Sequence, residues 1–210
     1  DNRAPDYPLV RRKYRILPGL AALLLLEAYL QTGYFMDLRP NVITSCCGAL
    51  FSEYAASVAG AVAAWPIRPA MAIFYLMLAL VFRLGVQLRW TGRPAQLFSV
   101  ASVAMTVVSI AAVVSFISVY VYELPTHHCP FCLLQSEYRF IGYPLYAALL
   151  AGGIAGGGVG VLDRIGSAAT LRAFLPAWQR RLCSISLAGF LAFALMATYP
   201  ILFSDFILEG

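Results

Sequence analysis

Two pairs of cysteines are the residues best suited to chemistry in this chain of 210 residues. Cys129 and Cys132 stand in the segment HHCPFC, residues 127–132, and Cys46 and Cys47 are adjacent. Two residues between cysteines is the spacing of redox dithiols, in which one thiol is often activated by a low pKa. The same spacing can supply two thiolates to a tetrahedral metal site. A structural disulfide that closes the loop is the third interpretation.

Neighbouring groups could tune these thiols. We expect Cys132 to lie at the start of a helix, where backbone N–H groups stabilise a thiolate. His127 and His128 would add positive charge to the segment when protonated. The same two histidines could also act as metal ligands beside the cysteines.

The adjacent pair Cys46 and Cys47 favours different chemistry. A disulfide between neighbours is strained, because bonded cysteines usually have Cα atoms about 5.5 Å apart. Strained disulfides are easily reduced, so the pair suits a redox switch or a metal clamp better than a permanent crosslink. Alternatively, one of the two exchanges with Cys129, or both are small buried apolar residues.

The composition defines the kind of protein that must position these cysteines. Hydrophobic residues make up 61% of the chain and charged residues only 12%, whereas soluble domains have roughly 45–50% and about 25%. This excludes a soluble globular domain and a disordered chain. The mean hydropathy of +0.77 and the long apolar runs predict an all-α integral membrane protein. The net charge of +5 does not indicate nucleic-acid binding, because the basic residues flank apolar segments.

The apolar runs predict five transmembrane helices in a single bundle domain, residues 16–203. The predicted spans cover residues 16–35, 70–88, 97–121, 140–162 and 182–203, each above the roughly 17-residue minimum for crossing a bilayer. Residues 46–65 are rich in Ala and Ser and contain Glu53, so we expect a half-helix or interfacial helix there. Residues 1–15 and 204–210 are expected to be polar tails at the two ends of the chain.

The distribution of basic residues predicts the orientation of the spans. With the N-terminus in the cytoplasm, few basic residues fall on the outer side, namely Arg39, Arg68 and Arg139. Many fall on the cytoplasmic side: Arg3, Arg11, Arg12, Lys13, Arg15, Arg89, Arg93, Arg164, Arg172, Arg180 and Arg181. The positive-inside rule therefore favours a cytoplasmic N-terminus and an outer C-terminus. Both cysteine pairs then lie on the outer, disulfide-permissive side of a bacterial-type inner membrane.

Two further features stand out within the predicted spans. Glu27 lies mid-span, where an ionisable group is costly, so we expect it to face the bundle interior as a proton relay or ligand, or to be protonated or paired with Arg83. Glycines recur every fourth residue at Gly152, Gly156 and Gly160. Such a ridge indicates close approach of neighbouring helices and not ligand binding.

The two cysteine segments together resemble the vitamin K epoxide reductase family and, more loosely, the DsbB-type membrane thiol–disulfide oxidoreductases. The similarity rests on PNVITSCCG, residues 40–48, and CPFCLL, residues 129–134. The chain has no cysteine in residues 36–45, where the family has an upstream loop cysteine, and it has Cys47 in addition.

The resemblance implies a quinone-linked disulfide oxidoreductase. By matching position, Cys132 would face the quinone and Cys129 would exchange with Cys46 or Cys47. Phe131, Tyr138 and Tyr143 would line the quinone site, with Glu27 as a further candidate. A thioredoxin-like protein on the outer face is the implied partner.

A second hypothesis assigns the same residues to a metal or cofactor site. Cys46, Cys47, Cys129 and Cys132 could form a Cys₄ site for zinc or copper(I), with His127 or His128 as substitute ligands. The chain would then be a subunit of a membrane complex. A purely structural accessory subunit of such a complex is the remaining alternative.

Overall fold

The computed structural model describes residues 7, 9–37, 51, 56–165 and 174–204. These residues form helices joined by turns, with no strand in the described part of the chain. Five helical segments are long and apolar enough to cross a membrane: Val10–Asp37, Ile67–Thr91, Ala95–Tyr122, Gly142–Ile165 and Leu175–Phe203. The predicted all-α fold with five segments of spanning length is therefore confirmed.

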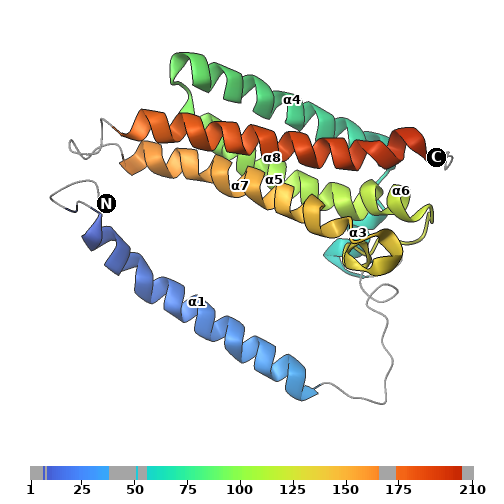
Figure 1. The fold of residues 1–210 in the computed structure, drawn as a ribbon. Coiled ribbons are helices and arrows are strands. Elements are labelled where there is room, and N and C mark those ends of the chain that lie inside the picture. Colours follow the sequence, from blue (N-terminus) through green and yellow to red (C-terminus); the bar gives the residue numbers. More distant parts are fainter. Residues whose placement is uncertain (1–6, 8, 38–50, 52–55, 166–173, 205–210) are drawn as a thin grey trace. The chain divides into compact units, whose positions relative to one another are not determined.

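The chain divides into two compact units, which are described separately. The first contains helix α1, Val10–Asp37 (Figure 1). Halfway along α1, the side chain of Glu27 accepts a 3.1 Å hydrogen bond from Nε2 of Gln31, one turn further on. This contact is local to α1. A role for Glu27 at the cysteine site, or its pairing with Arg83, stays a prediction.

The second unit contains the other helices. In chain order they are α3 (Val58–Ala63), α4 (Ile67–Thr91), α5 (Ala95–Ala112), the π-helix η1 (Val113–Ile117), α6 (Ser118–Tyr122), the 3₁₀ helices η2 (Cys132–Leu134) and η3 (Ser136–Tyr138), α7 (Gly142–Ile165) and α8 (Leu175–Phe203). The segments α5, η1 and α6 follow one another without a break. Of the predicted half-helix at 46–65, the described part is helical only in α3, and residues 46–50 and 52–55 lie outside the described residues.

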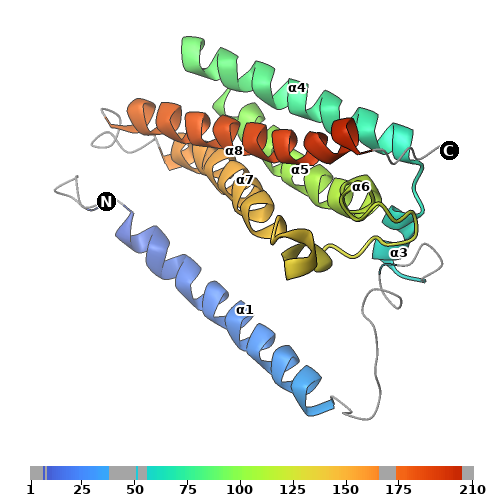
Figure 2. The same cartoon turned by 45° about the vertical axis from the view of Figure 1, so that its right-hand side comes forward.

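Helices α4, α5, α7 and α8 form a bundle with alternating directions (Figures 1 and 2). Helix α7 packs against α5 and α8, and α4 packs against the same two helices. Aromatic rings fill the core: the ring of Phe74 lies 6.0 Å from those of Phe116 and Phe193, between ring centres. All three rings are fully buried, so close van der Waals packing of aromatic rings stabilises the contacts between these helices.

The glycine ridge of α7 has the predicted role of bringing helices together. A Cβ atom on Gly189 of α8 would lie 2.6 Å from the backbone nitrogen of Gly152, so only glycine permits this approach. A hydrogen bond also joins the two helices at this point, since Oγ of Ser186 donates to the carbonyl of Gly152 at 2.7 Å. The prediction of close helix packing is confirmed.

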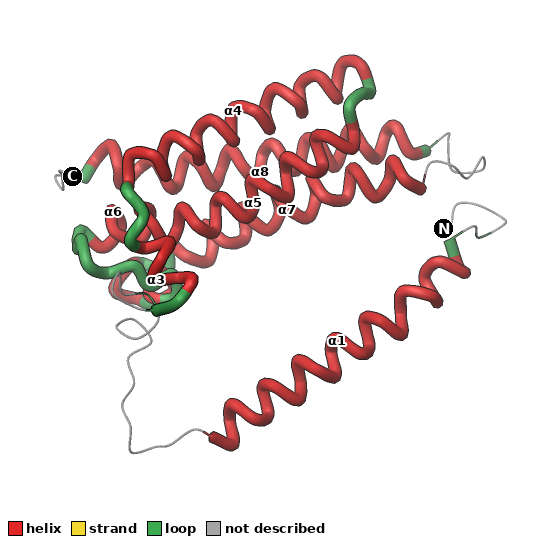
Figure 3. The backbone as a smooth tube through the Cα atoms, turned by 180° about the vertical axis from the view of Figure 1, so that it is seen from behind, coloured by secondary structure: helices red, strands yellow, loops and turns green. Residues whose placement is uncertain are grey.

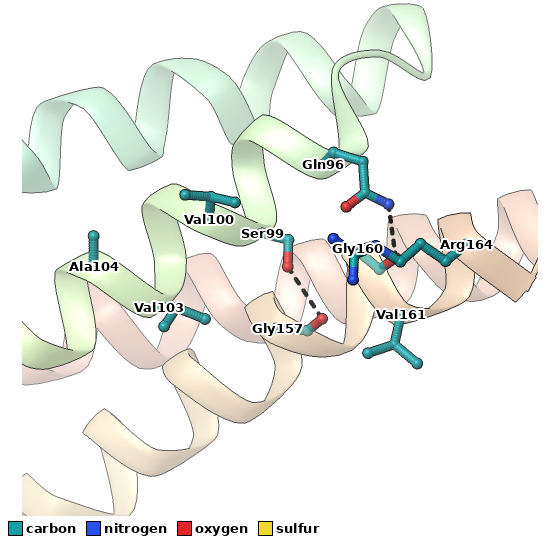
Figure 4. Close-up of a pocket in the computed structure, with 9 residues that line it drawn as sticks. All are labelled: Gln96, Ser99, Val100, Val103, Ala104, Gly157, Gly160, Val161 and Arg164. Atoms are coloured by element: carbon teal, nitrogen blue, oxygen red, sulfur yellow. Dashed lines mark hydrogen bonds between the residues drawn. The ribbon is translucent and has the colours of Figure 1, made fainter.

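The opposite flank of the ridge contacts α5 in the same way. Oγ of Ser99 donates to the carbonyl of Gly157 at 3.1 Å, and Nε2 of Gln96 donates to the carbonyl of Gly160 at 2.9 Å (Figure 4). A groove of about 360 Å³ runs beside these contacts, with Arg164 at its rim. Small residues therefore allow α5 and α8 to pack closely against α7. Each of the two contacts also includes hydrogen bonds from side chains to backbone carbonyls of α7.

The two ends of the bundle contain different residues, and Figure 3 shows the helix ends and turns that meet at each. One end, which we call the cysteine end, contains α3, α6, η2, η3, the start of α7 and the end of α8. The other, the arginine end, contains the ends of α4 and α7 and the starts of α5 and α8. Its arginines are Arg83, Arg89, Arg93, Arg164, Arg180 and Arg181. Among the described residues of this unit, Arg68 and Arg139 lie at the cysteine end, so the excess of arginines at the other end is the asymmetry that the positive-inside rule describes.

Candidate functional site

The dithiol segment lies in the loop between α6 and α7, at the cysteine end. Cys129 is fully buried and Cys132 is 7% exposed. Phe131, between them, is 59% exposed. The loop therefore turns both cysteines toward the bundle and its central aromatic ring outward.

Cys132 begins a helix, as expected, but this helix is the three-residue 3₁₀ turn η2. The long helix α7 begins only at Gly142. Backbone geometry explains the delay, because Arg139 and Phe140 have φ values of +53° and +56°, which an α-helix cannot accommodate. The fourth spanning segment, predicted at 140–162, is therefore found at Gly142–Ile165, but Cys132 lies in a separate short turn before it. A single short turn also offers Cys132 little of the stabilisation that a long helix dipole would give a thiolate.

Two tyrosines from the flanking helices hold the backbone of the dithiol loop. The hydroxyl of Tyr122, the last residue of α6, donates to the carbonyl of Cys129 at 2.6 Å. The hydroxyl of Tyr146, on the first turns of α7, donates to the carbonyl of Pro130. Because buried carbonyls are costly to leave unpaired, these two bonds fix the loop where its first cysteine meets the bundle. Sequence reasoning missed both tyrosines.

His128 anchors the loop to the interior of the bundle. Its side chain is 4% exposed, and its Nδ1 lies 2.9 Å from the carbonyl oxygen of Val114. A carbonyl only accepts hydrogen bonds, so Nδ1 carries a proton and donates.

The acceptor of this bond belongs to the π-helix η1. The N–H of Ser118 donates to the carbonyl of Val113, a five-residue spacing that widens the helical turn. Such π-turns occur mostly as single insertions in α-helices and are frequent at functional sites. Here the widened turn presents the carbonyl of Val114 to His128. No pattern in the sequence indicated this turn.

His127 has a different environment from its neighbour. Its ring packs edge-on against Tyr122, with ring centres 4.6 Å apart, and Tyr122 also packs against Tyr138 at 4.3 Å. Nε2 of His127 is buried and has no hydrogen-bond partner in the described part of the chain. Burial lowers the pKa of His127, and the neighbouring His128 lowers it further. The structure therefore disfavours the expected positive charge on His127 near neutral pH.

Phe51 connects the first cysteine segment to the second. Its ring packs edge-on against that of Phe131, with ring centres 5.9 Å apart. Phe51 follows Cys46 and Cys47 closely in the sequence, but both cysteines lie outside the described residues. The structure therefore places a residue near the first pair beside the second pair, and the position of the first pair itself stays a prediction.

The other expected ligand residues are spread over this end. Tyr138 is half-buried against Tyr122, whereas Tyr143 is 60% exposed and lies 6.1 Å from Phe140 between ring centres. Phe131, Phe140 and Tyr143 thus present exposed aromatic rings around the dithiol loop.

The expected metal site can be examined only in part. Among the described residues, no group of three or more His, Cys, Asp or Glu side chains is arranged to hold a metal ion. Cys46 and Cys47, which would complete the expected Cys₄ set, lie outside those residues. A zinc or copper site therefore stays a prediction.

Comparison with known proteins adds no relative: no family model, no curated protein and no solved structure matches the chain.

Proposed function

We propose that this protein is a membrane thiol–disulfide oxidoreductase that passes electrons between a dithiol protein and a quinone. The observation that carries the proposal is the pair of buried cysteines in the Cys-Pro-Phe-Cys loop, which is fixed by hydrogen bonds at the end of an apolar helical bundle. A C-x-x-C pair with this support suits repeated making and breaking of one disulfide.

Burial of both cysteines defines how the exchange must proceed. A folded partner protein cannot bring a thiolate to a sulfur that is fully buried, as Cys129 is. A cysteine from the same chain must therefore act as the intermediate. Cys46 and Cys47 are the candidates, because they lie five and four positions before Phe51, whose ring contacts Phe131. A chain of that length spans at most about 14–18 Å.

The electrons and protons of the cycle balance as follows. A partner thiolate attacks the sulfur of Cys46 or Cys47 in its disulfide with Cys129, so a mixed disulfide forms and the Cys129 thiolate leaves. The second partner thiol then attacks the mixed disulfide, which releases the oxidised partner. The quinone then oxidises the thiols of Cys129 and Cys132 to a disulfide. The freed thiolate of Cys46 or Cys47 attacks the sulfur of Cys129 in that disulfide, which releases the Cys132 thiolate and restores the starting state. Each cycle releases two electrons and two protons, which convert one quinone to a quinol.

The residues present fit an aromatic acceptor beside Cys132. The exposed rings of Phe131 and Tyr143 and the half-buried ring of Tyr138 would offer packing surfaces to a quinone, since flat rings pack well against aromatic side chains. Tyr122 and Tyr146 would keep the loop in place, and His127, favoured in its neutral form, would accept a proton from a cysteine thiol. We propose an inner-membrane location with this end on the outer side, which the arrangement of arginines supports.

Quinone reduction by the purified, full-length protein tests the proposal. A reduced dithiol protein of thioredoxin type serves as the electron donor, and quinone absorbance is followed. We expect the substitution Cys132→Ser to reduce the rate to that of the uncatalysed reaction. The matched control is Cys183→Ser, because Cys183 is also buried but lies toward the arginine end, where its thiol contacts the carbonyl of Gly85. An unchanged rate in Cys132→Ser would refute the proposal.

A further inference from the structure

A polar pocket of about 270 Å³ lies at the arginine end, between the end of α4 and the start of α8. Its polar lining comes from Arg89 and Thr91 on α4 and from Gln179 and Arg180 on α8. None of the described residues that line it is acidic. Two guanidinium groups with no carboxylate in the lining create a site of positive potential, which favours an anion.

A serine of α8 holds the guanidinium group of Arg89 against the start of that helix. Nη1 of Arg89 donates to Oγ of Ser184, and Oγ of Ser184 donates to the carbonyl of Arg180 at 2.9 Å. This chain uses one of the five N–H donors of the Arg89 guanidinium. The remaining donors suit a ligand with several acceptor oxygens, because a guanidinium can bind two of them at once.

Helix α8 adds to the positive potential. It begins at Leu175, directly beside the pocket, and is 29 residues long. The start of a long helix carries a partial positive charge and unpaired N–H groups, which stabilise anions. The opposing negative charge at the end of α4 is reduced by Arg89, in the last turn of that helix.

Tryptophans indicate the depth of the pocket in a membrane. Trp90 lines the pocket and is 86% exposed. Trp178, in the first turn of α8, packs against Arg181, whose guanidinium carbon lies 5.4 Å from the ring centre. Tryptophans gather at the level of lipid headgroups, where the ring contacts both apolar and polar groups. The pocket would therefore lie where phosphates of a bilayer are found.

We propose that this pocket binds the phosphate group of an anionic phospholipid. Basic pockets between the ends of transmembrane helices hold such headgroups, and arginine binds phosphate more specifically than lysine does. The ligand chemistry is a phosphate oxyanion, which a lipid or free inorganic phosphate could supply. This inference does not depend on the thiol chemistry at the opposite end of the bundle.

Lipid titration of the purified, full-length protein in detergent tests the proposal. Native mass spectrometry measures binding of short-chain phosphatidylglycerol, with phosphatidylcholine as the neutral reference. We expect the protein to bind phosphatidylglycerol in preference to phosphatidylcholine. We expect Arg180→Gln to weaken the binding of phosphatidylglycerol about tenfold, because it removes one charge-assisted contact. Arg180→Lys keeps the charge but loses the bidentate geometry of the guanidinium. Its affinity for phosphatidylglycerol should therefore lie between those of the unchanged protein and Arg180→Gln.

The matched control is Arg164→Gln, which removes the same charge at the same end but outside the pocket. Its affinity for phosphatidylglycerol should stay within about twofold of the unchanged protein. An equal loss in Arg164→Gln and Arg180→Gln, or equal binding of both lipids, would overturn the proposal. Displacement of the lipid by millimolar inorganic phosphate, lost in Arg180→Gln, would overturn the lipid source in favour of free phosphate. Helicity by circular dichroism confirms that each variant is folded.

Discussion

The hydroxyl of Tyr122 donates a 2.6 Å hydrogen bond to the carbonyl of Cys129. This bond joins the last residue of α6 to the first cysteine of the dithiol segment, seven residues later in the chain. Both residues are buried, so neither group can turn to water if the bond is lost. The position of the buried cysteine therefore depends directly on a helix of the bundle.

Replacement of Tyr122 by phenylalanine should loosen the dithiol loop. The substitution leaves the carbonyl of Cys129 buried without this donor, at an expected cost of about 1–3 kcal/mol in the free energy of unfolding. We also expect Cys129 and Cys132 to react faster with a thiol reagent after reduction. Thermal unfolding and labelling kinetics in detergent measure the two effects. Tyr199→Phe is the control, because Tyr199 is 65% exposed, and an equal effect there would contradict the prediction.

His127 should make the stability of the protein depend on pH. Its pKa is lowered in the folded protein, first by burial and then by His128, whereas a histidine in an unfolded chain titrates near pH 6.5. As the pH is lowered through about 6.5, the unfolded state therefore binds the proton first. The free energy of unfolding then decreases until the pH reaches the lower pKa of His127 in the folded protein. Above about pH 6.5, the contribution of His127 to the free energy of unfolding does not change with pH. The unfolding temperature of the unchanged protein should drop between pH 7.5 and 5.5.

The substitution His127→Gln isolates this effect, since glutamine does not titrate. We expect the drop in unfolding temperature between pH 7.5 and 5.5 to be smaller in the variant. Carboxylates titrate mainly at lower pH and contribute to both proteins alike. An equal or steeper drop in His127→Gln would show that His127 is not the group responsible.

The glycine contacts between α7 and α8 should be intolerant of even one methyl group. A Cβ on Gly189 would lie 2.6 Å from the nitrogen of Gly152 and 2.7 Å from the carbonyl oxygen of Ala148. Backbone atoms cannot turn aside as side chains do, so Gly189→Ala must separate the helices. We expect a loss of about 1–3 kcal/mol in stability, measured by unfolding in detergent.

Gly157→Ala provides the matched control on α7. The added Cβ would meet only Cγ2 of Val103, at an ordinary 3.8 Å. Because alanine is the better helix former by about 1 kcal/mol, this variant should be neutral or slightly more stable. A destabilisation of Gly157→Ala equal to that of Gly189→Ala would contradict the packing described here.

Elemental analysis of the purified protein distinguishes the redox proposal from the metal hypothesis. The redox proposal predicts less than about 0.1 equivalent of zinc or copper per chain. This result would be informative, because a structural zinc site binds its metal too tightly to lose it in purification. Near-stoichiometric metal, lost in Cys129→Ser but retained in Cys183→Ser, would favour the Cys₄ site instead.

Helix positions and the glycine ridge could be predicted from the sequence because they depend on periodic, one-dimensional patterns. An apolar run of about 20 residues must be a helix in a bilayer. Glycines four residues apart share a helix face, and Gly152 and Gly156 do lie against neighbouring helices. The serines that face this ridge, Ser99, Ser102 and Ser186, were missed, although serines in apolar helices are a usable signal for such interfaces.

The details of the cysteine end could not be predicted, because they depend on contacts between distant segments. His128 meets Val114 only because a π-turn presents that carbonyl. Tyr146 reaches Pro130 from sixteen residues away, and no local rule relates the two. The break between the turn at Cys132 and the start of α7 was not predicted, because the left-handed backbone of Arg139 and Phe140 occurs at residues that seldom adopt it.

The most direct test of the central claim is disulfide mapping of the Cys132→Ser variant. The protein is alkylated without reduction, digested, and analysed by mass spectrometry. Exchange through the first cysteine pair requires a bond to Cys129, and removing Cys132 should trap it. We predict a linked peptide that joins Cys46 or Cys47 to Cys129 and disappears on reduction. An alkylated Cys129 in protein prepared under oxidising conditions, with no linked peptide, would contradict the proposed exchange.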